Sequence, residues 1–592
     1  MTEYHAPLRD MHFVLDELAG MAKITGLPGY EEATPDLIEA ILGEASKLAS
    51  EVLAPLNQVG DRERLTFENG VVRMPPGFTE AYARFVEGGW GSLAADPDYG
   101  GQGLPWTLAI AVQEMWNAAN LSFALGPMLT QGVVAALQVH GTGEQKATYL
   151  PKLVSGEWAG TMNLTESHAG TDVGALKTRA VPEGDHYLIQ GQKIFITWGE
   201  HDCAENIVHM VLARIPGAPP GTKGLSLFIV PKFLPRADGT PGERNDLRCV
   251  SLEEKLGIHA SPTCVMAYGD SGGAAGYLLG EENQGMACMF TMMNNARMLV
   301  GLEGLALGER AYQAARDYAR ERIQGTALGD RDGGPVPIVR HPDVRRMLMT
   351  MRALNEAMRG LLYTAAAELD TAKRHPEPAA RARAQARIDL LTPVVKAWLT
   401  DSGCEVASLG IQVHGGMGYI EETGAAQYYR DVRIAPIYEG TNGVQALDLL
   451  TRKLLRDRGA AAKEFLAEMT ASLPELGGDG LGAALEPELA RMLEATDWLL
   501  ETGAADLARA AAGATPYLRL FGTVTGAWLL ARGAAAARRR LSNGGAEDRG
   551  FLEAKIATAQ FYMANILPRA TAEAAAVIHG ADSTLALDEA QF

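Results

Sequence analysis

The segment Lys193-Ile194-Phe195-Ile196-Thr197-Trp198-Gly199 places an alternating strand in the middle of the chain. Phe195 and Thr197 share one face of it, because successive side chains of a strand point to opposite sides. Taken alone, this pattern is typical of a sandwich strand with an aromatic residue in the core. Similar short runs, separated by Gly, Pro and Asp, fill residues 160–285. They predict an antiparallel β domain without the strand and helix alternation of a doubly wound sheet.

Helical patterns lie on both sides of this β region. Apolar residues recur at helical spacing from about residue 35 to 155 and again from Met286 to Arg456, with a loop expected between Gly325 and Pro337. An Ala- and Leu-rich segment follows to the end of the chain. We therefore predict a mostly helical α+β protein with four domains: a helical domain (1–159), a β domain (160–285), a helical bundle (286–458) and an extra helical bundle (459–592).

Composition excludes several classes of protein. The 592 residues exceed what one hydrophobic core usually fills, and 53 Lys and Arg against 72 Asp and Glu give a net charge of −19. This charge disfavours nucleic acid as the main partner. The five cysteines form no CxxC pair, so we expect a reducing, cytoplasmic compartment and no metal site.

The sequence gives no reason to expect export or a membrane span. The first ten residues do not resemble a secretory signal. The longest weakly polar stretch, Leu520–Ala537, is interrupted by Arg532, so we expect a buried bundle helix. The run Arg538-Arg539-Arg540 could serve a membrane surface, but on an acidic chain a solvated basic run is preferred. We expect no stable membrane insertion.

Two turn-rich segments could hold a ligand. Asn163-Leu164-Thr165-Glu166 leads into Ala169-Gly170-Thr171-Asp172-Val173, where backbone N–H groups and hydroxyls can hold an anion or the edge of a heterocycle. Most such turns merely satisfy their own backbone. Gln412-Val413-His414-Gly415-Gly416-Met417-Gly418-Tyr419 is not G-x-G-x-x-G and follows a helical pattern, so it does not predict a dinucleotide fold. Its glycines still allow a phosphate to approach the backbone.

Charged and polar residues cluster at two further places. Asn294-Asn295-Ala296-Arg297 lies near the start of a long predicted helix, and Arg320 to Gly325 lies at its end. Charges at helix ends are usually solvated or compensate the helix dipole. In Ile437-Tyr438-Glu439-Gly440-Thr441-Asn442-Gly443, Thr441 or Asn442 can cap the next helix. Glu439 then precedes a helix N-terminus, and stabilisation of the helix dipole is the simplest interpretation of it.

Together, in this order, these segments resemble the acyl-CoA dehydrogenase family. The resemblance covers about Pro35 to Arg456 and includes Asp96–Gly103 and Gly143–Pro151. It implies a helical N-terminal domain, a central β-barrel-like domain and a C-terminal four-helix bundle. It also implies FAD, bound across a subunit interface.

The same resemblance implies roles for individual residues. Glu439 is the base that removes the α-proton of an acyl-CoA, and a flavin accepts the hydride. The residues implied to hold the isoalloxazine are Leu164, Thr165, Thr171, Phe195 and Thr197. Those implied to hold the ADP part of a neighbouring subunit's FAD are Arg322, Gln324, Gln412, Gly415 and Gly416, and Thr441 and Asn442 are implied to complete the cofactor site. The residues implied to contact the substrate are Tyr438, Asn294 and Arg297. The chain departs from many members at Phe195, Gly325 and Gly443, where Trp, Phe and Gln are frequent.

A narrower resemblance concerns a long bacterial subgroup that includes an enzyme of dimethylsulfoniopropionate breakdown and several similar proteins of unassigned substrate. It rests on Tyr4–Met11, on Gly334–Pro337 and on the extra C-terminal bundle. It implies oxidation of 3-(methylthio)propanoyl-CoA to 3-(methylthio)acryloyl-CoA, electron-transferring flavoprotein as the acceptor, and a homodimer. The alternatives are a short- or medium-chain acyl-CoA dehydrogenase and an acyl-CoA oxidase, with a non-enzymatic binding protein ranked last.

Overall fold

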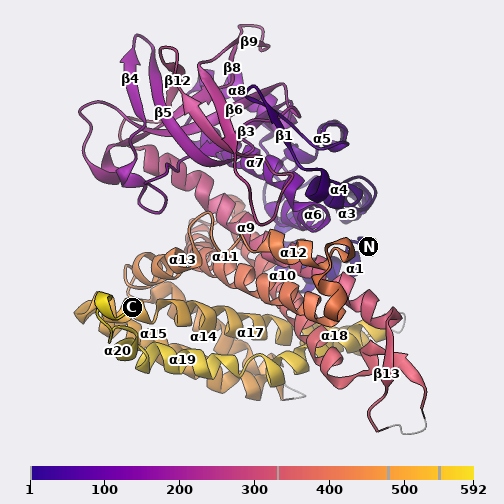
Figure 1. Cartoon of the computed structure of the whole chain (residues 1–592). Helices are drawn as coiled ribbons and strands as arrows, with labels where there is room; N and C mark the ends of the chain where they lie inside the picture. Colours follow the sequence, from indigo (N-terminus) through magenta and orange to yellow (C-terminus); the bar gives the residue numbers. More distant parts are fainter. Residues whose placement is uncertain (1–2, 330–332, 477–479, 545–547) are drawn as a thin grey trace. The chain divides into compact units, whose positions relative to one another are not determined.

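The computed structural model describes residues 3–329, 333–476, 480–544 and 548–592. The chain divides into two compact units (Figure 1). Unit 1 contains residues 1–42, 106–114 and 300–592, and unit 2 contains residues 43–105 and 115–299. The borders of the four predicted domains differ from these limits and stay predictions.

Unit 2 is built on an eight-stranded sheet. Its strands are β3 (Trp158–Asn163), β4 (Arg179–Glu183), β5 (His186–Thr197), β6 (Asn206–Arg214), β7 (Leu225–Pro231), β10 (Leu247–Leu252), β11 (Thr263–Tyr268) and β12 (Ala274–Leu279). The pairings β4–β5–β12–β7–β6 close on themselves where Arg179 of β4 pairs with Arg214 of β6. This ring confirms the β-barrel-like prediction, and Ile189, Phe228 and Met266 belong to its buried core.

The prediction of an antiparallel β domain is wrong for two pairings, both with β6, and β4 meets β6 in parallel at Arg179 and Arg214. β3 runs parallel to β6, from Trp158 opposite Asn206 to Asn163 opposite Val211. Parallel neighbours need a long crossover, and here β4 and β5 supply it. The sequence reading also missed the hairpin β1 (Thr66–Glu68) and β2 (Val71–Arg73) and the short pair β8 (Phe233–Pro235) and β9 (Pro241–Arg244), because such short strands carry almost no periodic signal.

The helices of unit 2 confirm the helical character of the N-terminal region. They are α4 (Ala54–Glu63), α5 (Phe78–Glu87), α7 (Leu121–His140) and α8 (Gly143–Ser155), while α3 (Pro35–Lys47), α6 (Trp106–Ala119) and α9 (Gly285–Glu321) each cross between the units. Among the described residues, α7 alone is long and apolar enough to cross a membrane by composition, yet 78% of its apolar window is buried. Val133 of α7 packs against Gly160 of β3, where an added Cβ would lie 2.7 Å away. We therefore assign α7 to the core of unit 2.

Unit 1 is helical, as predicted for both C-terminal regions. Its N-terminal elements are α1 (Leu8–Val14), the π-helix η1 (Leu15–Ala19) and α2 (Met21–Thr25). The bundle contains α10 (Pro342–Arg374), α11 (Pro378–His414), α12 (Ala425–Val432) and α13 (Asn442–Asp448). The extension contains α14 (Ala460–Ser472), α15 (Leu481–Ala505), α16 (Leu507–Ala512), α17 (Ala514–Ser542), α18 (Arg549–Asn565), α19 (Arg569–His579) and α20 (Ala581–Thr584).

Glycines let the long helices of unit 1 approach closely. A Cβ at Gly304 of α9 would lie 2.4 Å from the Leu399 carbonyl oxygen of α11, and a Cβ at Gly522 of α17 would lie 2.2 Å from Trp398. The extension is therefore packed against α11 rather than tethered to the bundle. The stretch Leu520–Ala537 lies in α17 and is buried except for Arg532, as expected for a bundle helix.

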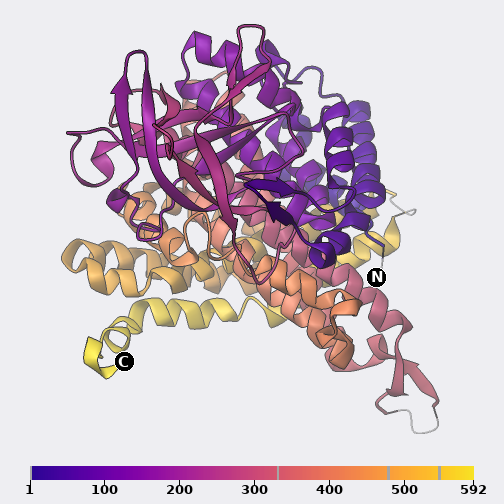
Figure 2. The same ribbon diagram turned by 45° about the horizontal axis from the view of Figure 1, so that its top comes forward.

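The loop predicted between Gly325 and Pro337 is partly a hairpin. β13 (Ile323–Thr326) pairs with β14 (Pro335–Pro337), and residues 330–332 of the predicted loop lie outside the described residues. The hairpin projects from the helices of unit 1 in both views (Figures 1 and 2). Three- and four-residue strands next to prolines are too short to be recognised by alternation.

Candidate active site

The loop that carries Glu439 has an unusual backbone. Glu439 has a φ of 53° and Gly440 a φ of 83°, so two successive residues are left-handed. For a residue with a side chain this conformation is uncommon and costs free energy, and such strain concentrates at functional sites. Thr441 is the N-cap of α13, since its Oγ1 accepts a hydrogen bond from Val444 N at 3.3 Å. The loop thus presents a half-buried carboxylate just before a helix start.

Two amide side chains hold this loop. Gln445 donates from Nε2 to the carbonyl oxygens of Glu439 (3.2 Å) and Gly440 (3.3 Å). Asn442 accepts from Lys396 Nζ at 2.9 Å and donates to Asp401 Oδ1 at 2.7 Å, both on α11. The position of Glu439 is therefore fixed from two sides. The Asn442 amide serves the anchoring of the loop, and its predicted contact with FAD stays a prediction.

A residue that sequence reasoning missed lies behind this loop. The Tyr438 hydroxyl donates a hydrogen bond to Oε2 of Glu303, a fully buried residue of α9. Burial raises the pKa of Glu303 to about 8, although the Tyr438 hydrogen bond and the charge of Lys396 act in the opposite direction. The available signal was a lone acid in the apolar run Met298–Leu307, between Gly301 and Gly304.

In unit 2, a buried ion pair fixes the turn after β3. Lys193 Nζ donates to the Leu164 carbonyl oxygen and to Glu166 Oε1, each at 2.9 Å, and the Thr165 carbonyl oxygen accepts from Ile194 N at 2.9 Å. Burial alone would raise the pKa of Glu166, but the charge of Lys193 and hydrogen bonds from Thr178 lower it to about 2. The predicted residues Leu164 and Thr165 are thus placed against β5 by charge-assisted contacts.

A β-bulge in β5 turns the side chain of Phe195 toward solvent. The register with β11 shifts between Cys264 and Met266, and Phe195 has a φ of 59°. Phe195 is 58% exposed, so the interpretation as a core aromatic is wrong. The aromatic residue in the core is Trp198, whose Nε1 donates to the Ser122 carbonyl oxygen at 3.2 Å. A bulge re-aims one side chain without breaking the strand.

The remaining predicted flavin contacts in unit 2 are more accessible. The Thr197 carbonyl oxygen accepts a hydrogen bond from the Thr161 hydroxyl at 2.7 Å, and Thr197 is partly exposed beside Phe195. Thr171 is exposed in the turn that follows β3. Hydroxyl groups next to an outward-facing ring form a surface that can bind a polar heterocycle.

The residues predicted for the ADP part of FAD lie in unit 1. Arg322 Nη2 donates to Gln324 Oε1 at 3.3 Å, at the base of the β13 hairpin. Gln412, Gly415 and Gly416 are exposed where α11 ends. Gly415 has a φ of 61°, and a Cβ at either glycine would meet open space. This backbone is accessible to a phosphate-bearing ligand, as FAD requires.

The predicted substrate contacts on α9 lie in unit 2. Arg297 is buried, and its guanidinium lies 6.0 Å from the centre of the Phe290 ring. The charge is therefore not a solvated helix-end charge, contrary to the simple interpretation. The side chain of Asn294 lies outside the described part of the structure. Within the described ranges no group of three or more His, Cys, Asp or Glu is arranged to hold a metal ion.

Within each unit, the predicted residues fit the chemistry of a flavin. Unit 2 offers the threonine hydroxyls and an outward-facing ring at Phe195, and unit 1 offers the exposed glycine backbone and Arg322 with Gln324. Unit 1 also holds the strained carboxylate Glu439. The residues of unit 2 can bind a heterocycle, and those of unit 1 can bind a pyrophosphate and move one proton.

Family models match nearly the whole chain. The matches are to the acyl-CoA dehydrogenase N-terminal domain (residues 36–157), middle domain (161–270) and C-terminal domain (283–454). A fourth, acetyl-CoA dehydrogenase C-terminal like, covers residues 460–588. The extension therefore has counterparts in other proteins.

Individual relatives agree with these models. The chain is 48% identical to 3-methylmercaptopropionyl-CoA dehydrogenase of Ruegeria pomeroyi, over 98% of this chain and 99% of that protein. It is 36% identical to a broad-specificity linear acyl-CoA dehydrogenase of Mycobacterium tuberculosis over 100% of both chains. The fold resembles an acyl-CoA dehydrogenase from Bacillus anthracis solved with FAD, with a TM-score of 0.75 and 21% identity over 96% of this chain and 91% of that chain. The chain therefore belongs to the acyl-CoA dehydrogenase family of FAD-dependent oxidoreductases, which act on acyl-CoA substrates.

Proposed function

We propose that the protein oxidises 3-(methylthio)propanoyl-CoA to 3-(methylthio)acryloyl-CoA, with Glu439 as the base. The observation that carries the role of Glu439 is its strained, anchored backbone beside a buried acid. The substrate is supported by the relative from Ruegeria pomeroyi, whose 48% identity extends through the C-terminal extension.

The reaction removes one proton and one hydride from neighbouring carbons. The Glu439 carboxylate takes the proton from Cα, the C–H electron pair forms the Cα–Cβ double bond, and the hydride leaves from Cβ. Bound FAD supplies the hydride acceptor, a role that protein side chains cannot fill. The main-chain N–H of Glu439 donates to the thioester oxygen, which acidifies Cα before the proton moves.

Closure of the acyl chain over Glu439 strengthens it as a base. A carboxylate is a weak base in water, but exclusion of water disfavours its charge and raises its proton affinity. Tyr438 lies next to Glu439 and would form one wall of the acyl pocket. In unit 2, Phe195 and the Thr197 hydroxyl would orient the flavin ring.

The physiological setting is part of the proposal. We infer electron-transferring flavoprotein as the acceptor, a homodimer as the assembly and the cytoplasm as the location. The exposed apolar residues Met417, Tyr419 and Ile420, next to Gly415 and Gly416, support a protein contact at the predicted ADP site. Five unpaired cysteines support a reducing compartment.

A plain acyl-CoA is the second candidate substrate. The relative from Mycobacterium tuberculosis acts on linear acyl-CoA, and its identity of 36% also extends over the whole chain. A missing or added methylene changes specificity by only about 1–3 kcal/mol, so one pocket can accept both classes.

An anaerobic titration of the holoprotein separates the two substrates. The flavin absorbance is followed while 3-(methylthio)propanoyl-CoA, butanoyl-CoA and octanoyl-CoA are added in separate experiments. Bleaching by the first at much lower concentration supports the proposal. Preferred bleaching by a linear acyl-CoA would change the assigned substrate and leave the proposed reaction unchanged. Fast re-oxidation by oxygen, rather than by electron-transferring flavoprotein, would instead identify an oxidase.

Glu439→Gln tests the base. Because Gln keeps the size and the loop contacts but cannot accept the proton, we expect FAD to stay bound and flavin reduction to slow by about 10³-fold. Glu494→Gln, an exposed acid of α15, is the matched control and should reduce at the wild-type rate. Reduction of Glu439→Gln at more than a tenth of the wild-type rate would remove Glu439 from its role.

A further inference from the structure

Glu303 is a buried acid with an incomplete set of partners. Its side chain has 0% exposure, Oε2 accepts from the Tyr438 hydroxyl, and Oε1 has no hydrogen-bond partner in the described structure. An unpaired buried oxygen is costly, and such groups are rare in folded proteins. The arrangement therefore calls for a reason beyond packing.

The charged groups around Glu303 belong to two elements of unit 1. Lys396 of α11 attracts it, while Glu439 of the loop before α13 repels it. Lys396 also donates to Asn442, so its ammonium is shared with the anchor of the same loop. Asp401 lies one turn further along α11 and accepts from Asn442. The Lys396 ammonium is thus shared between Glu303 and the Asn442 amide, and ionisation of Glu303 near the Glu439 carboxylate is unfavourable.

We propose that Glu303 is a positioning residue for the base: its carboxyl group holds Tyr438 and with it the segment that carries Glu439, and a negative charge on Glu303 strengthens Glu439 as a base. This inference rests on the proposed role of Glu439. The hydrogen bond fixes residue 438, and Gln445 fixes the backbone of residues 439 and 440, so the carboxylate between them has little freedom.

The second part of the proposal follows from charge. A negative charge next to Glu439 raises its proton affinity, and Glu439 loses its own charge when it takes the substrate proton. Ionisation of Glu303 therefore favours proton abstraction. Glu303 itself does not touch the substrate in this scheme, because it lies behind Tyr438.

Infrared titration of the holoprotein tests the protonation of Glu303 without any substrate. A carbonyl band of a protonated carboxyl group should disappear with a midpoint near pH 8 in the wild-type protein and be missing from Glu303→Gln. In Tyr438→Phe the midpoint should move upward, since the carboxylate loses a hydrogen-bond donor. An identical titration in Glu303→Gln overturns the proposal. Should that variant not fold, an unmoved midpoint in Tyr438→Phe does so.

The rate of flavin reduction tests the coupling to the base. We expect the wild-type rate constant to rise about threefold or more between pH 7 and pH 9, and this rise to be absent from Glu303→Gln. The matched control is Glu573→Gln on α19, another acid whose pKa burial raises, and it should keep the rise. The same rise in Glu303→Gln overturns the coupling. If no acyl-CoA reduces the wild-type flavin, the proposed function fails, while the infrared result still decides the state of Glu303.

Discussion

Helix α9 carries two buried acids, Glu303 and Glu309, with opposite surroundings. Glu309 accepts from Arg359 Nη2 at 3.1 Å and from Gln313 Nε2 at 3.0 Å. Among the described residues, Glu303 accepts a hydrogen bond only from the neutral Tyr438 hydroxyl. One helix thus holds a carboxylate in direct contact with a cation and a carboxyl group whose direct partner is neutral. The difference separates an acid that serves stability from one available for function.

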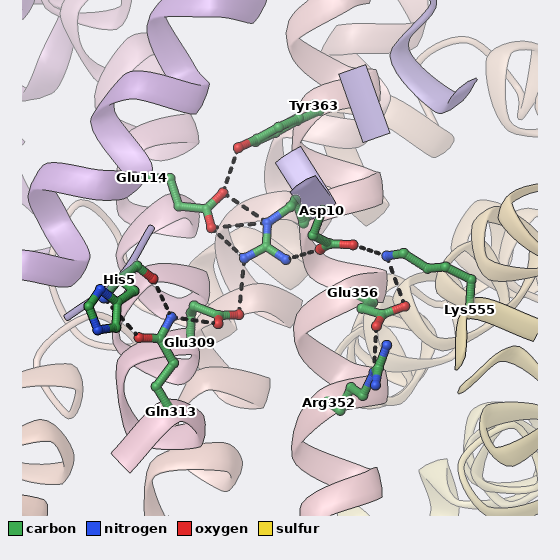
Figure 3. Close-up of polar contacts among 10 residues, drawn as sticks. His5, Asp10, Glu114, Glu309, Gln313, Arg352, Glu356, Tyr363 and Lys555 are labelled. Atoms are coloured by element: carbon green, nitrogen blue, oxygen red, sulfur yellow. Dashed lines mark hydrogen bonds and ion pairs between the residues drawn. The ribbon is translucent and has the colours of Figure 1, made fainter. Parts of the chain in front are cut away.

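The cluster around Arg359 shows what full pairing looks like (Figure 3). The Arg359 guanidinium contacts Glu114 of α6, Asp10 of α1 and Glu309. Lys555 of the extension pairs with the same Asp10 and, at 3.1 Å, with Glu356. The cluster therefore ties the N-terminal helix and the extension to the bundle. Its residues come from segments far apart in the sequence, so no local sequence pattern predicts the cluster.

Arg359→Met should have the largest effect on stability, because it removes the cation that the buried acids of this cluster share. It leaves Glu114, Glu309 and Asp10 buried without their shared cation, which we expect to lower the free energy of unfolding by about 3–5 kcal/mol. Urea unfolding monitored by circular dichroism measures the loss. Arg383→Met removes the exposed pairs with Glu464 and Glu468 and should cost less than about 1 kcal/mol. Equal losses in both variants would mean that the buried cluster contributes nothing special.

Glu303→Gln should act in the opposite direction. A raised pKa means that the folded protein keeps a proton that the unfolded chain releases between pH 4.5 and about 8, so stability falls as the pH rises through that window. Gln does not titrate, and we expect a gain of about 4 kcal/mol at pH 8 and none at pH 4.5. Glu114→Gln, by contrast, should destabilise at pH 8. A loss of stability in Glu303→Gln at pH 8 would mean that Glu303, like the acids paired with Arg359, stabilises the fold.

Much of the fold follows from sequence patterns. Helical periodicity on both sides of a β-rich centre predicts the class, and the buried part of α17 follows from its composition. The parallel pairing of β3 does not follow, because a continuous buried strand reads the same in either direction. The bulge that turns Phe195 outward depends on the register with β11, which the segment itself does not encode.

The candidate site divides in the same way. Glu439 and the cap at Thr441 lie within one short segment, so local residues predict a carboxylate before a helix. Glu303 is 136 positions from Glu439 along the chain, and only the packing of α9 on α11 brings it behind the loop. The role of Lys193 was likewise missed, since its contacts with Leu164 and Glu166 cross from one strand to the turn after another.

The smallest effect concerns a pair whose charge changes near neutral pH, His259 and Asp61 in unit 2. Nδ1 lies 2.7 Å from Asp61 Oδ1 and Nε2 lies 3.0 Å from the Lys255 carbonyl oxygen, so both ring nitrogens can donate only when the ring is protonated. The hydrogen bond to Asp61 raises the pKa of His259. The pair therefore stabilises the fold below about pH 6.5, and this contribution, about 1 kcal/mol or less, is lost as the pH rises through the raised pKa. Hydrogen exchange of α4 amides, corrected for the intrinsic rate, should show weaker protection at pH 8 than at pH 6, and His259→Gln should abolish that difference. If His259→Gln shows the same difference in protection between pH 6 and pH 8, the ion pair with Asp61 does not contribute to the stability of this site.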